Sequence, residues 1–598
     1  MSKRRTISAI LIATVFLAST GFAQSLEDHW KDFVHYVKIG HSELAKGFAQ
    51  AILQSNPDPV ELLALSKASP EDYQILKLVY ESKRDAELAD LVGKVLSLID
   101  KGTFTRRTDA PIIAEEVRRL TGTERGWVTA VKRLQAAGEY AIPFMFDAMT
   151  DSTRSGEYAN IVRALPYIGN DAIRPLVVAL HTDNVAVKGE IIKALGKIGY
   201  PQSQGYLKYI AETDESPALR SMAGSSLAQI DPSAAQVPAA RLFYKLAEDY
   251  YYHAESLAPQ EDADFGNLWF WNPQEGKLER VEVDKGYFYE LMSMRACEWA
   301  LRADPTFGQA IGLWVAAFFK AESAGVEMPA FFGPAHADAL VYATTAGVQY
   351  LHQALARAVK DNNAYVALGV VEALATTAGE KSLLYRIGTA QPLMEALRFN
   401  NRAVRYSAAI AIASAGPTEK FAESKLVIAN LAQAIGPARG GAAGSEDTMW
   451  SEGIANTYAV RAATAMLKLA ESRNSMIELP LAQQYLAAAT NDKRPEIQIL
   501  AGKVLAYLDS PDAQRAIAAM ALAEGNSPEV RVAAFESLAT SAKLNACMLV
   551  DQMVDGIYAL ISSDQTDPDL RSAAAAAYGA LNLPSQKVKD LILDQAKK

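Results

Sequence analysis

The sequence predicts an all-α fold, an α-α superhelix in which short helix pairs stack in a row, with one insert that carries a β-hairpin. The main observation is a repeat: the segments SPEVR at 527–531 and DPDLR at 567–571 lie 40 residues apart, and each opens an alanine-rich stretch. Each copy begins with a Ser or Asp that can cap a helix, a proline where no N–H is needed, and an acid that the helix dipole favours. Such a period indicates a solenoid, because one helix pair alone cannot bury its apolar face.

The first 23 residues have the three parts of a secretory signal peptide. Residues 3–5 are basic, 7–17 are uncharged and mostly apolar, and Gly21 and Ala23 are the small residues that a signal peptidase reads. We expect cleavage after Ala23 and export to the bacterial periplasm or the medium. The Arg pair leaves the twin-arginine route open beside the general secretory route, whose pattern the flanking residues fit better. No later stretch is apolar for the length that spans a membrane.

Residues 24–135 are predicted to form short amphipathic helices without a recognisable repeat. The segments 57–66, 72–81 and 86–99 each combine apolar and polar positions at helical spacing. The first helix of this region places the following residues on one face: Trp30, Phe33, Val34 and Val37. We therefore expect an N-terminal helical segment that precedes the regular array.

Regular helix pairs begin after Gly138, and the clearest pair combines 172–180 with 185–199. The second helix of this pair carries one apolar stripe at offsets of four, eight and eleven residues: Val187, Ile191, Leu195 and Ile198. Gly199 is predicted to end this helix as a left-handed cap, and Pro201 prevents its continuation. Similar pairs follow at 392–416 and in the C-terminal part of the chain.

These pairs resemble HEAT repeats, over about 140–230 and 365–595. The resemblance implies a helical solenoid and says little about activity. In HEAT proteins an arginine after the characteristic apolar position typically pairs with an acid of the neighbouring unit. By this resemblance the positions of such a ladder are Arg220, Arg405, Arg531 and Arg571. Lys188 and Gln498 interrupt it, and we interpret the arginines as inter-repeat pairs rather than as an anion-binding row.

An aromatic-rich insert separates the two arrays. Its first helix, about 241–257, is followed by an aromatic run and an alternating run on either side of a turn, which predicts a hairpin over 268–283. The segment ACEWALRADP at 296–305 resembles the second helix of a tetratricopeptide repeat, where small residues allow close helix crossing and Asp-Pro ends the helix. We therefore expect a tetratricopeptide-like insert that carries the only hairpin.

Three tryptophans are the candidates for partner binding. Trp269 and Trp271 share one face of the predicted strand, and Trp450 follows a Gly-rich segment at 436–445 that is predicted to be a flexible loop. Aromatic side chains are enriched at recognition sites because they offer large rigid contact areas. Burial under the hairpin is the competing interpretation, and the loop is either a mobile flap or a tolerated insertion. Trp299 and Trp314 are expected in the core.

The predicted division of the chain follows from these features. It comprises a signal peptide (1–23), an N-terminal helical segment (24–135), HEAT-like repeats (136–235), the tetratricopeptide-like insert (236–360), further HEAT-like repeats (361–435), a flexible loop (436–455) and C-terminal HEAT-like repeats (456–598).

The composition disfavours several classes of partner. The chain has 69 acidic and 59 basic residues, a net charge of -10, so phosphate backbones are repelled overall. No basic stripe with exposed aromatics suggests nucleic-acid binding, and no polybasic amphipathic segment suggests a membrane surface. Cys297 and Cys547 lie 250 residues apart, which argues against a disulfide because repeats of a solenoid contact only their neighbours.

No motif with catalytic, cofactor-binding or metal-binding chemistry emerges from the sequence. Every Gly-Lys pair is followed by an aliphatic residue, so there is no phosphate-binding loop, and neither His-Glu-x-x-His nor Cys-x-x-Cys occurs. His29, His35 and His41 are each six residues apart, which directs them to different sides of a continuous helix. We therefore expect no catalytic residue, no cofactor and no metal.

Three functions remain open. The preferred one is an exported, non-enzymatic scaffold that binds a protein or peptide on the concave face of the solenoid, lined by second helices. The alternatives are a ligand-binding or cofactor-binding protein or enzyme with its site near the aromatic hairpin, and a self-associating structural protein of the cell envelope. The order of segments resembles exported bacterial HEAT-repeat proteins of unknown function, which implies a fold but no activity.

Overall fold

The computed structural model describes residues 25–259, 264–325, 337–436 and 450–583, together with 327, 329, 586, 589, 590, 592 and 593. These residues are mostly helical and contain one two-stranded sheet, as the sequence predicted. The predicted signal peptide and most of the predicted flexible loop lie outside the described residues. Within them no helix is long and apolar enough to cross a membrane.

The chain divides into two compact units. The first unit contains the chain up to Ser203 and the tip of the hairpin at 268–281. The second unit contains 204–259, the start of the first strand at 265–267, and the chain from Glu282 onward. The seven-part division drawn from the sequence stays a prediction. Cys297 and Cys547 are free thiols, so the predicted lack of a bridge between them is confirmed.

The first unit contains the helices α1 (Leu26–Lys38), α2 (Ser42–Gln54), α3 (Pro59–Ala68), α4 (Pro70–Ser82), α5 (Ala86–Thr108), α6 (Ala110–Arg119), α7 (Glu124–Ala137), α8 (Ala141–Thr150), α9 (Tyr158–Ala164), α10 (Ile173–Ala179) and α11 (Val185–Ile198).

The second unit contains α12 (Gln204–Thr213), α13 (Pro217–Ile230), α14 (Ala239–Tyr251), α15 (Phe288–Ala303), α16 (Gln309–Glu322), α17 (Ala339–Ala346), α18 (Val348–Lys360), α19 (Ala364–Thr377), α20 (Glu380–Leu383), α21 (Pro392–Ala396), α22 (Arg402–Ala415), α23 (Ser424–Ile435), α24 (Glu452–Glu471), α25 (Gln483–Ala489), α26 (Pro495–Leu505), α27 (Pro511–Leu522), α28 (Pro528–Asn545), α29 (Asp551–Ser562) and α30 (Pro568–Ala580). The strands are β1 (Phe265–Asn272) and β2 (Lys277–Asp284).

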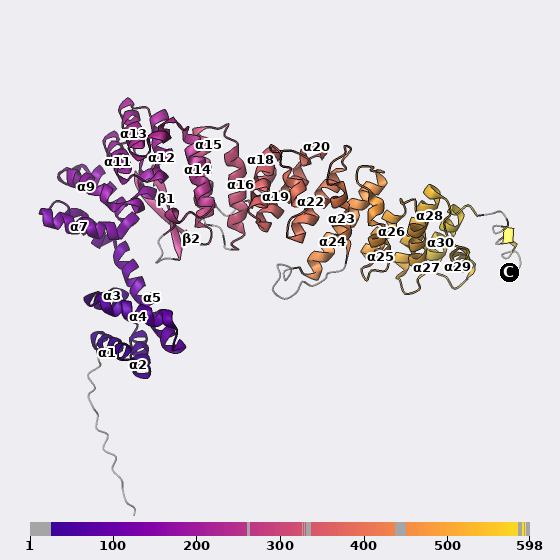
Figure 1. Ribbon diagram of the computed structural model, residues 1–598, viewed down its shortest axis with the longest axis horizontal. Coiled ribbons are helices and arrows are strands. Elements are labelled where there is room, and N and C mark those ends of the chain that lie inside the picture. The colour runs from indigo at the N-terminus through magenta and orange to yellow at the C-terminus, as the bar shows by residue number, and fades with distance from the viewer. Residues whose placement is uncertain are drawn as a thin grey trace, which may run out of the picture. The chain divides into compact units, whose positions relative to one another are not determined.

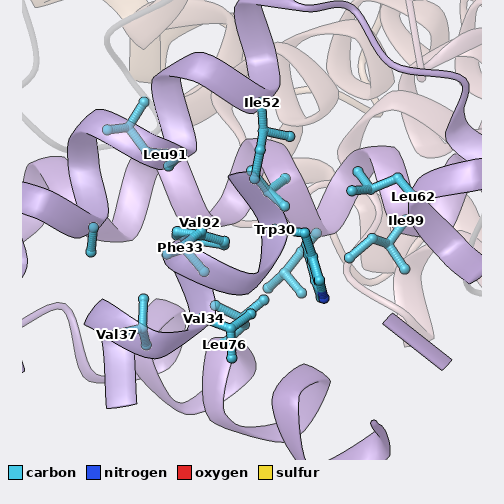
Figure 2. Close-up of a cluster of buried hydrophobic side chains, with 14 of the residues drawn as sticks. Trp30, Phe33, Val34, Val37, Ile52, Leu62, Leu76, Leu91, Val92 and Ile99 are labelled. Atoms are coloured by element: carbon cyan, nitrogen blue, oxygen red, sulfur yellow. The ribbon is translucent and has the colours of Figure 1, made fainter. Parts of the chain in front are cut away.

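The N-terminal helices α1–α5 enclose one apolar cluster, and Figure 2 shows how their side chains converge on it. The predicted stripe on α1 is confirmed, since its residues are all buried: Trp30, Phe33, Val34 and Val37. Helices α3 and α5 cross at Gly102, where an added Cβ would lie 2.0 Å from the carbonyl oxygen of Pro59. The absence of a side chain at Gly102 therefore lets the two backbones come into contact.

The helix starts of the terminal repeats follow the local sequence. The hydroxyl of Ser527 accepts a hydrogen bond from the backbone N–H of Val530, and Pro528 occupies the first turn of α28. Asp567 caps α30 in the same way. Gly199 ends α11 with a left-handed backbone conformation, φ +79°, as predicted. These caps supply partners for the N–H groups that the first turn of a helix leaves free.

Two rows of helices run through the second unit from α18 to α30, in the order that Figure 1 shows. The second helices of successive pairs each contact the next, and we call them the second-helix row: α19, α22, α24, α26, α28 and α30. The first helices form the other row: α18, α21, α23, α25, α27 and α29. This stacking of pairs on neighbouring pairs is the solenoid that the repeat predicted.

The predicted acid-to-arginine ladder is wrong at the four arginines assigned to it. Arg220 Nη1 donates to the carbonyl of Asp214 at 2.7 Å, and Arg405 Nη1 donates to the carbonyl of Phe399 at 2.7 Å. Arg531 and Arg571 likewise bind carbonyls at the end of the preceding helix or in the loop after it. The reason is that the last carbonyls of a helix lack N–H partners and attract cations, and they lie closer than any acid of the next pair.

Candidate functional site

Trp269, the first predicted binding residue, is part of the core of the first unit. Its side chain is 4% exposed, and its Nε1–H donates to Glu139 Oε2 at 2.8 Å. Glu139 is itself buried beside the guanidinium of Arg174, with the closest N···O distance at 3.4 Å. The indole N–H thus satisfies a buried carboxylate, which is costly to leave without donors. The sequence left two interpretations open for Trp269, burial and partner binding, and the structure shows burial.

The rest of the hairpin tip packs against the same part of the first unit. Trp271 is half-buried and meets the ring of Phe146 edge-on, with centroids 5.6 Å apart. From the second strand, the guanidinium of Arg280 lies 4.8 Å above the ring of Tyr140. As predicted, Trp269 and Trp271 lie on one face of β1, and that face contacts α8 and the turn before it. The hairpin tip is therefore anchored by its aromatic residues.

Trp450, the third predicted residue, belongs to an aromatic group on the second-helix row. Its ring stacks on Tyr458 of α24 with centroids 5.2 Å apart and meets Tyr406 of α22 edge-on at 5.8 Å. The guanidinium of Arg402 lies 4.7 Å above the indole. Trp450 precedes Ser451, whose hydroxyl caps α24 by accepting the N–H of Ile454. The cap fixes where α24 starts, and because Trp450 directly precedes the capping residue, it also fixes the position of the Trp450 backbone.

A polar network from three successive second helices supports these rings. Ser407 Oγ of α22 donates to Glu372 Oε1 of α19 at 2.8 Å, and it lies 3.1 Å from the hydroxyl of Tyr458. Arg461 Nη2 of α24 donates to both oxygens of Glu372, at 3.0 and 2.9 Å. Burial raises the pKa of Tyr458, so its hydroxyl keeps its proton. We call this group the aromatic–arginine cluster: Glu372, Arg402, Tyr406, Ser407, Trp450, Tyr458 and Arg461.

A second charged cluster lies within the insert, and it was not predicted from the sequence. Glu290 of α15 is 2% exposed; its Oε1 lies 2.6 Å from His253 Nε2 and 3.1 Å from Lys320 Nζ of α16. Burial alone would raise the pKa of Glu290, but the hydrogen bond from His253 and the charge of Lys320 lower it. Lys320 Nζ also donates to the carbonyl of Tyr251 at 2.6 Å. The ammonium of Lys320 on α16 thus contacts both the carbonyl at the end of α14 and the carboxylate of Glu290 on α15.

His253 in this cluster has an unusual backbone conformation. It follows α14 with φ +54°, a region that favours glycine, and the next residue, Ala254, donates its N–H to the carbonyl of Asp249. The imidazole stacks on Tyr289 with centroids 4.4 Å apart. A non-glycine residue in this region costs about 1 kcal/mol or more, which its contacts with Glu290 and Tyr289 offset. The cluster therefore serves as a structural ion group that fixes the end of α14.

Among the described residues, no group of three or more His, Cys, Asp or Glu side chains could hold a metal ion. Cys297 is buried, and burial raises the pKa of its thiol well above the ordinary value, so it stays protonated and unreactive. Trp450 is half-buried among two buried tyrosines and the half-exposed side chains of Arg402 and Arg461. Tyr458 lies only eight residues after Trp450, whereas Arg402 and Tyr406 belong to α22, and this distance along the chain kept the group from being recognised.

Comparison with known proteins agrees with this architecture. Residues 142–228 match the family model of HEAT repeats, and they include all of α8 except its first residue, α9–α12 and all but the last two residues of α13. None of the curated proteins matches the chain.

Several solved structures align with nearly the whole chain at low identity. The karyopherin Kap121p, solved with the extreme C-terminus of the protein phosphatase Cdc14p, is 11% identical, covers 94% of this chain and 72% of its own, and has a TM-score of 0.24. SYS-1, solved in complex with POP-1, is 10% identical, covers 94% and 100%, and has a TM-score of 0.25. Importin beta is 12% identical, covers 93% and 79%, and has a TM-score of 0.21. These TM-scores are too low for any conclusion about this chain.

Proposed function

We propose that this HEAT-repeat protein is an exported, non-enzymatic scaffold that binds a protein or peptide partner along its second-helix row. The observation that carries the proposal is the aromatic–arginine cluster, which combines a half-buried tryptophan with arginines and belongs to three consecutive second helices. Second helices line the concave surface on which repeat proteins hold extended partners.

The composition of the cluster is that of a binding hot spot. Trp, Tyr and Arg are the residues that contribute most at protein interfaces, especially where neighbouring contacts hold them rigid. Trp450 is held by Tyr406 and Tyr458, and Arg461 is held by Glu372. Side chains fixed before binding lose little conformational entropy when a partner arrives. The cluster is therefore built for recognition more than for support of a deep core.

A site at the hairpin is less favoured by the geometry. Trp269 is buried against Glu139, and Trp271 is packed on Phe146, so a ligand there would have to displace contacts that hold the tip in place. The export part of the proposal rests on the sequence of residues 1–23 alone. Cell fractionation, with mass spectrometry of the mature N-terminus, tests it; a cytoplasmic chain that retains residues 1–23 would contradict it.

Affinity capture from the envelope fraction of the source cells tests the scaffold function. The bait is the mature chain, and the matched variants are Trp450→Ala on the second-helix row and Tyr485→Ala on α25 of the first-helix row. Tyr485 is 50% exposed, so its loss removes a comparable aromatic surface from the other row. We expect a stoichiometric partner with the wild type and with Tyr485→Ala, and a reduced yield with Trp450→Ala. No partner in any condition, or dependence on Tyr485 alone, would contradict the proposal.

A further inference from the structure

We propose that the segment bound at the aromatic–arginine cluster is an acidic peptide, with a carboxylate on Arg461 and an aromatic or aliphatic side chain on Trp450. This inference rests on the proposed function and adds the chemistry of the partner. It follows from the hydrogen-bond geometry of Arg461, from the stacking of Trp450 and from the local balance of charge.

Arg461 is positioned but only partly used. Both of its hydrogen bonds to Glu372 come from a single nitrogen, Nη2, while the side chain remains 35% exposed. Within the described part of the chain, Nε and Nη1 of Arg461 donate to no other group. The guanidinium also lies 5.5 Å from the centre of the Tyr458 ring, which limits its rotation. Glu372 thus orients the guanidinium, and the N–H groups of Nη1 can donate a charge-assisted hydrogen bond to a further carboxylate.

Trp450 provides the apolar half of the same site. It is half-buried, and its contacts with Tyr458 and Tyr406 fix the plane of the indole. Tyr458 contacts both the indole of Trp450 and the guanidinium of Arg461, so the apolar surface and the charge share one neighbouring side chain. A peptide with an acidic residue close to an aromatic or aliphatic one would contact both. Fixed aromatic surfaces beside arginine are typical anchors at interfaces.

The local charge favours an acidic rather than a basic partner. The chain as a whole has a net charge of -10. In the aromatic–arginine cluster, the guanidinium groups of Arg402 and Arg461 nevertheless lie against the rings of Trp450 and Tyr458, and Glu372 pairs with Arg461. A carboxylate here gains charge-assisted hydrogen bonds, whereas a lysine or arginine would meet like charges. The overall negative charge disfavours a nucleic acid, which would bring many phosphates near the whole surface.

Fluorescence anisotropy with labelled synthetic peptides tests this chemistry on the mature chain. The probes are a peptide of two Glu, one Phe and two Glu, its analogue with Gln in place of every Glu, and its analogue with Lys. The variants are Arg461→Gln, Arg461→Lys and Trp450→Ala, with Tyr485→Ala as the control on the other row. Arg461→Lys keeps the ion pair with Glu372, which guards against a variant that merely unfolds; circular dichroism checks every variant.

We expect the Glu peptide to bind at least tenfold more tightly than the Gln analogue, and more weakly as salt increases. Arg461→Gln should weaken it by about tenfold to a hundredfold, since hydrogen bonds to charged groups are lost, and Arg461→Lys should fall between. Equal binding of the Glu and Gln peptides, or no effect of either Arg461 variant, would overturn the inference. So would displacement of the Glu peptide by an oligonucleotide of equal charge at lower concentration. Capture of the envelope partner could still depend on Trp450 while the Glu peptide binds no better than the Gln peptide. That result would support the scaffold function and contradict the acidic chemistry of the bound segment.

Discussion

Replacing Gly102 by alanine should destabilise the N-terminal helices, although alanine is the better helix former. The Cβ of the new residue would lie 2.0 Å from the carbonyl oxygen of Pro59, which is a backbone atom of α3 and cannot turn aside as a side chain does. An ordinary carbon–oxygen contact is about 3.4 Å. Helices α3 and α5 would therefore have to separate by more than 1 Å, and the apolar contacts around Leu62 and Ile99 would loosen (Figure 2).

The size of the effect follows from two opposing terms. Alanine gains about 1 kcal/mol over glycine in a helix interior. Forcing extra volume into a packed contact costs about 1–3 kcal/mol, and here the upper end applies because the obstructing atom belongs to the backbone. The expected net loss is about 2 kcal/mol, which is about a 30-fold increase in the equilibrium constant for local opening.

Two matched substitutions separate sterics from helix propensity. A Cβ at Gly47 in α2 would meet nothing within 4 Å, so Gly47→Ala should stabilise the same cluster by about 0.5–1 kcal/mol. A Cβ at Gly93 in α5 would meet the ring of Tyr80 at 2.7 Å, but that side chain is 46% exposed and can move aside. Gly93→Ala should therefore fall between the other two variants.

Hydrogen exchange measured by mass spectrometry on the mature chain is the suitable assay. Repeat proteins open locally, so exchange in the peptides of α1–α5 reports on this cluster more directly than global melting does. We expect exchange there to be fastest for Gly102→Ala and slowest for Gly47→Ala, with α26–α30 unchanged in both. If Gly102→Ala protects these helices as well as Gly47→Ala does, the close backbone crossing deduced here is wrong.

Three further predictions concern buried polar groups. Glu290→Gln should destabilise the chain at neutral pH by about 3 kcal/mol in urea unfolding, because Lys320 loses its buried partner. The folded state lowers the pKa of Glu290, so the wild type should lose this stability as pH falls below 4.5 through the folded pKa. The variant should show no such loss. Burial lowers the pKa of His352 below its ordinary 6.5, so stability should be complete above that pH and decline as pH falls toward the folded pKa; a wild-type profile as flat between pH 7.5 and 5.5 as that of His352→Gln would argue against it. Trp269→Phe should cost about 1–3 kcal/mol by thermal unfolding, because Glu139 loses a donor inside the core, whereas an unchanged melting temperature would mean that water replaces the indole.

The sequence predicted the features that depend on neighbouring residues. Ser527 and Asp567 cap their helices, and Gly199 ends α11, because these interactions involve residues only a few positions apart. The hairpin was predictable for the same reason: its turn and its alternation are local. Its observed strands, Phe265–Asn272 and Lys277–Asp284, extend the predicted span of 268–283 by a few residues.

The clusters could not be predicted because their members come from distant parts of the chain. Glu372 and Arg461 are 89 residues apart, and Trp269 is 130 residues from the carboxylate that accepts its N–H. The sequence placed Trp269 on a predicted strand, but nothing near it in the chain showed that its indole N–H would bind the buried carboxylate of Glu139. The arginine ladder failed for a related reason: the family pattern pairs arginines with acids, whereas Arg405 binds carbonyls in the loop between the two helices of its own pair.

The carbonyl contacts of Arg220, Arg405, Arg531 and Arg571 have a consequence for how such an array grows. Each of these guanidinium groups binds within its own pair of helices, so it adds no charge contact to the joint with the adjoining pair. A duplicated or deleted module would leave these arginines with their acceptors intact. Moderate salt should accordingly leave these four arginine–carbonyl contacts unchanged.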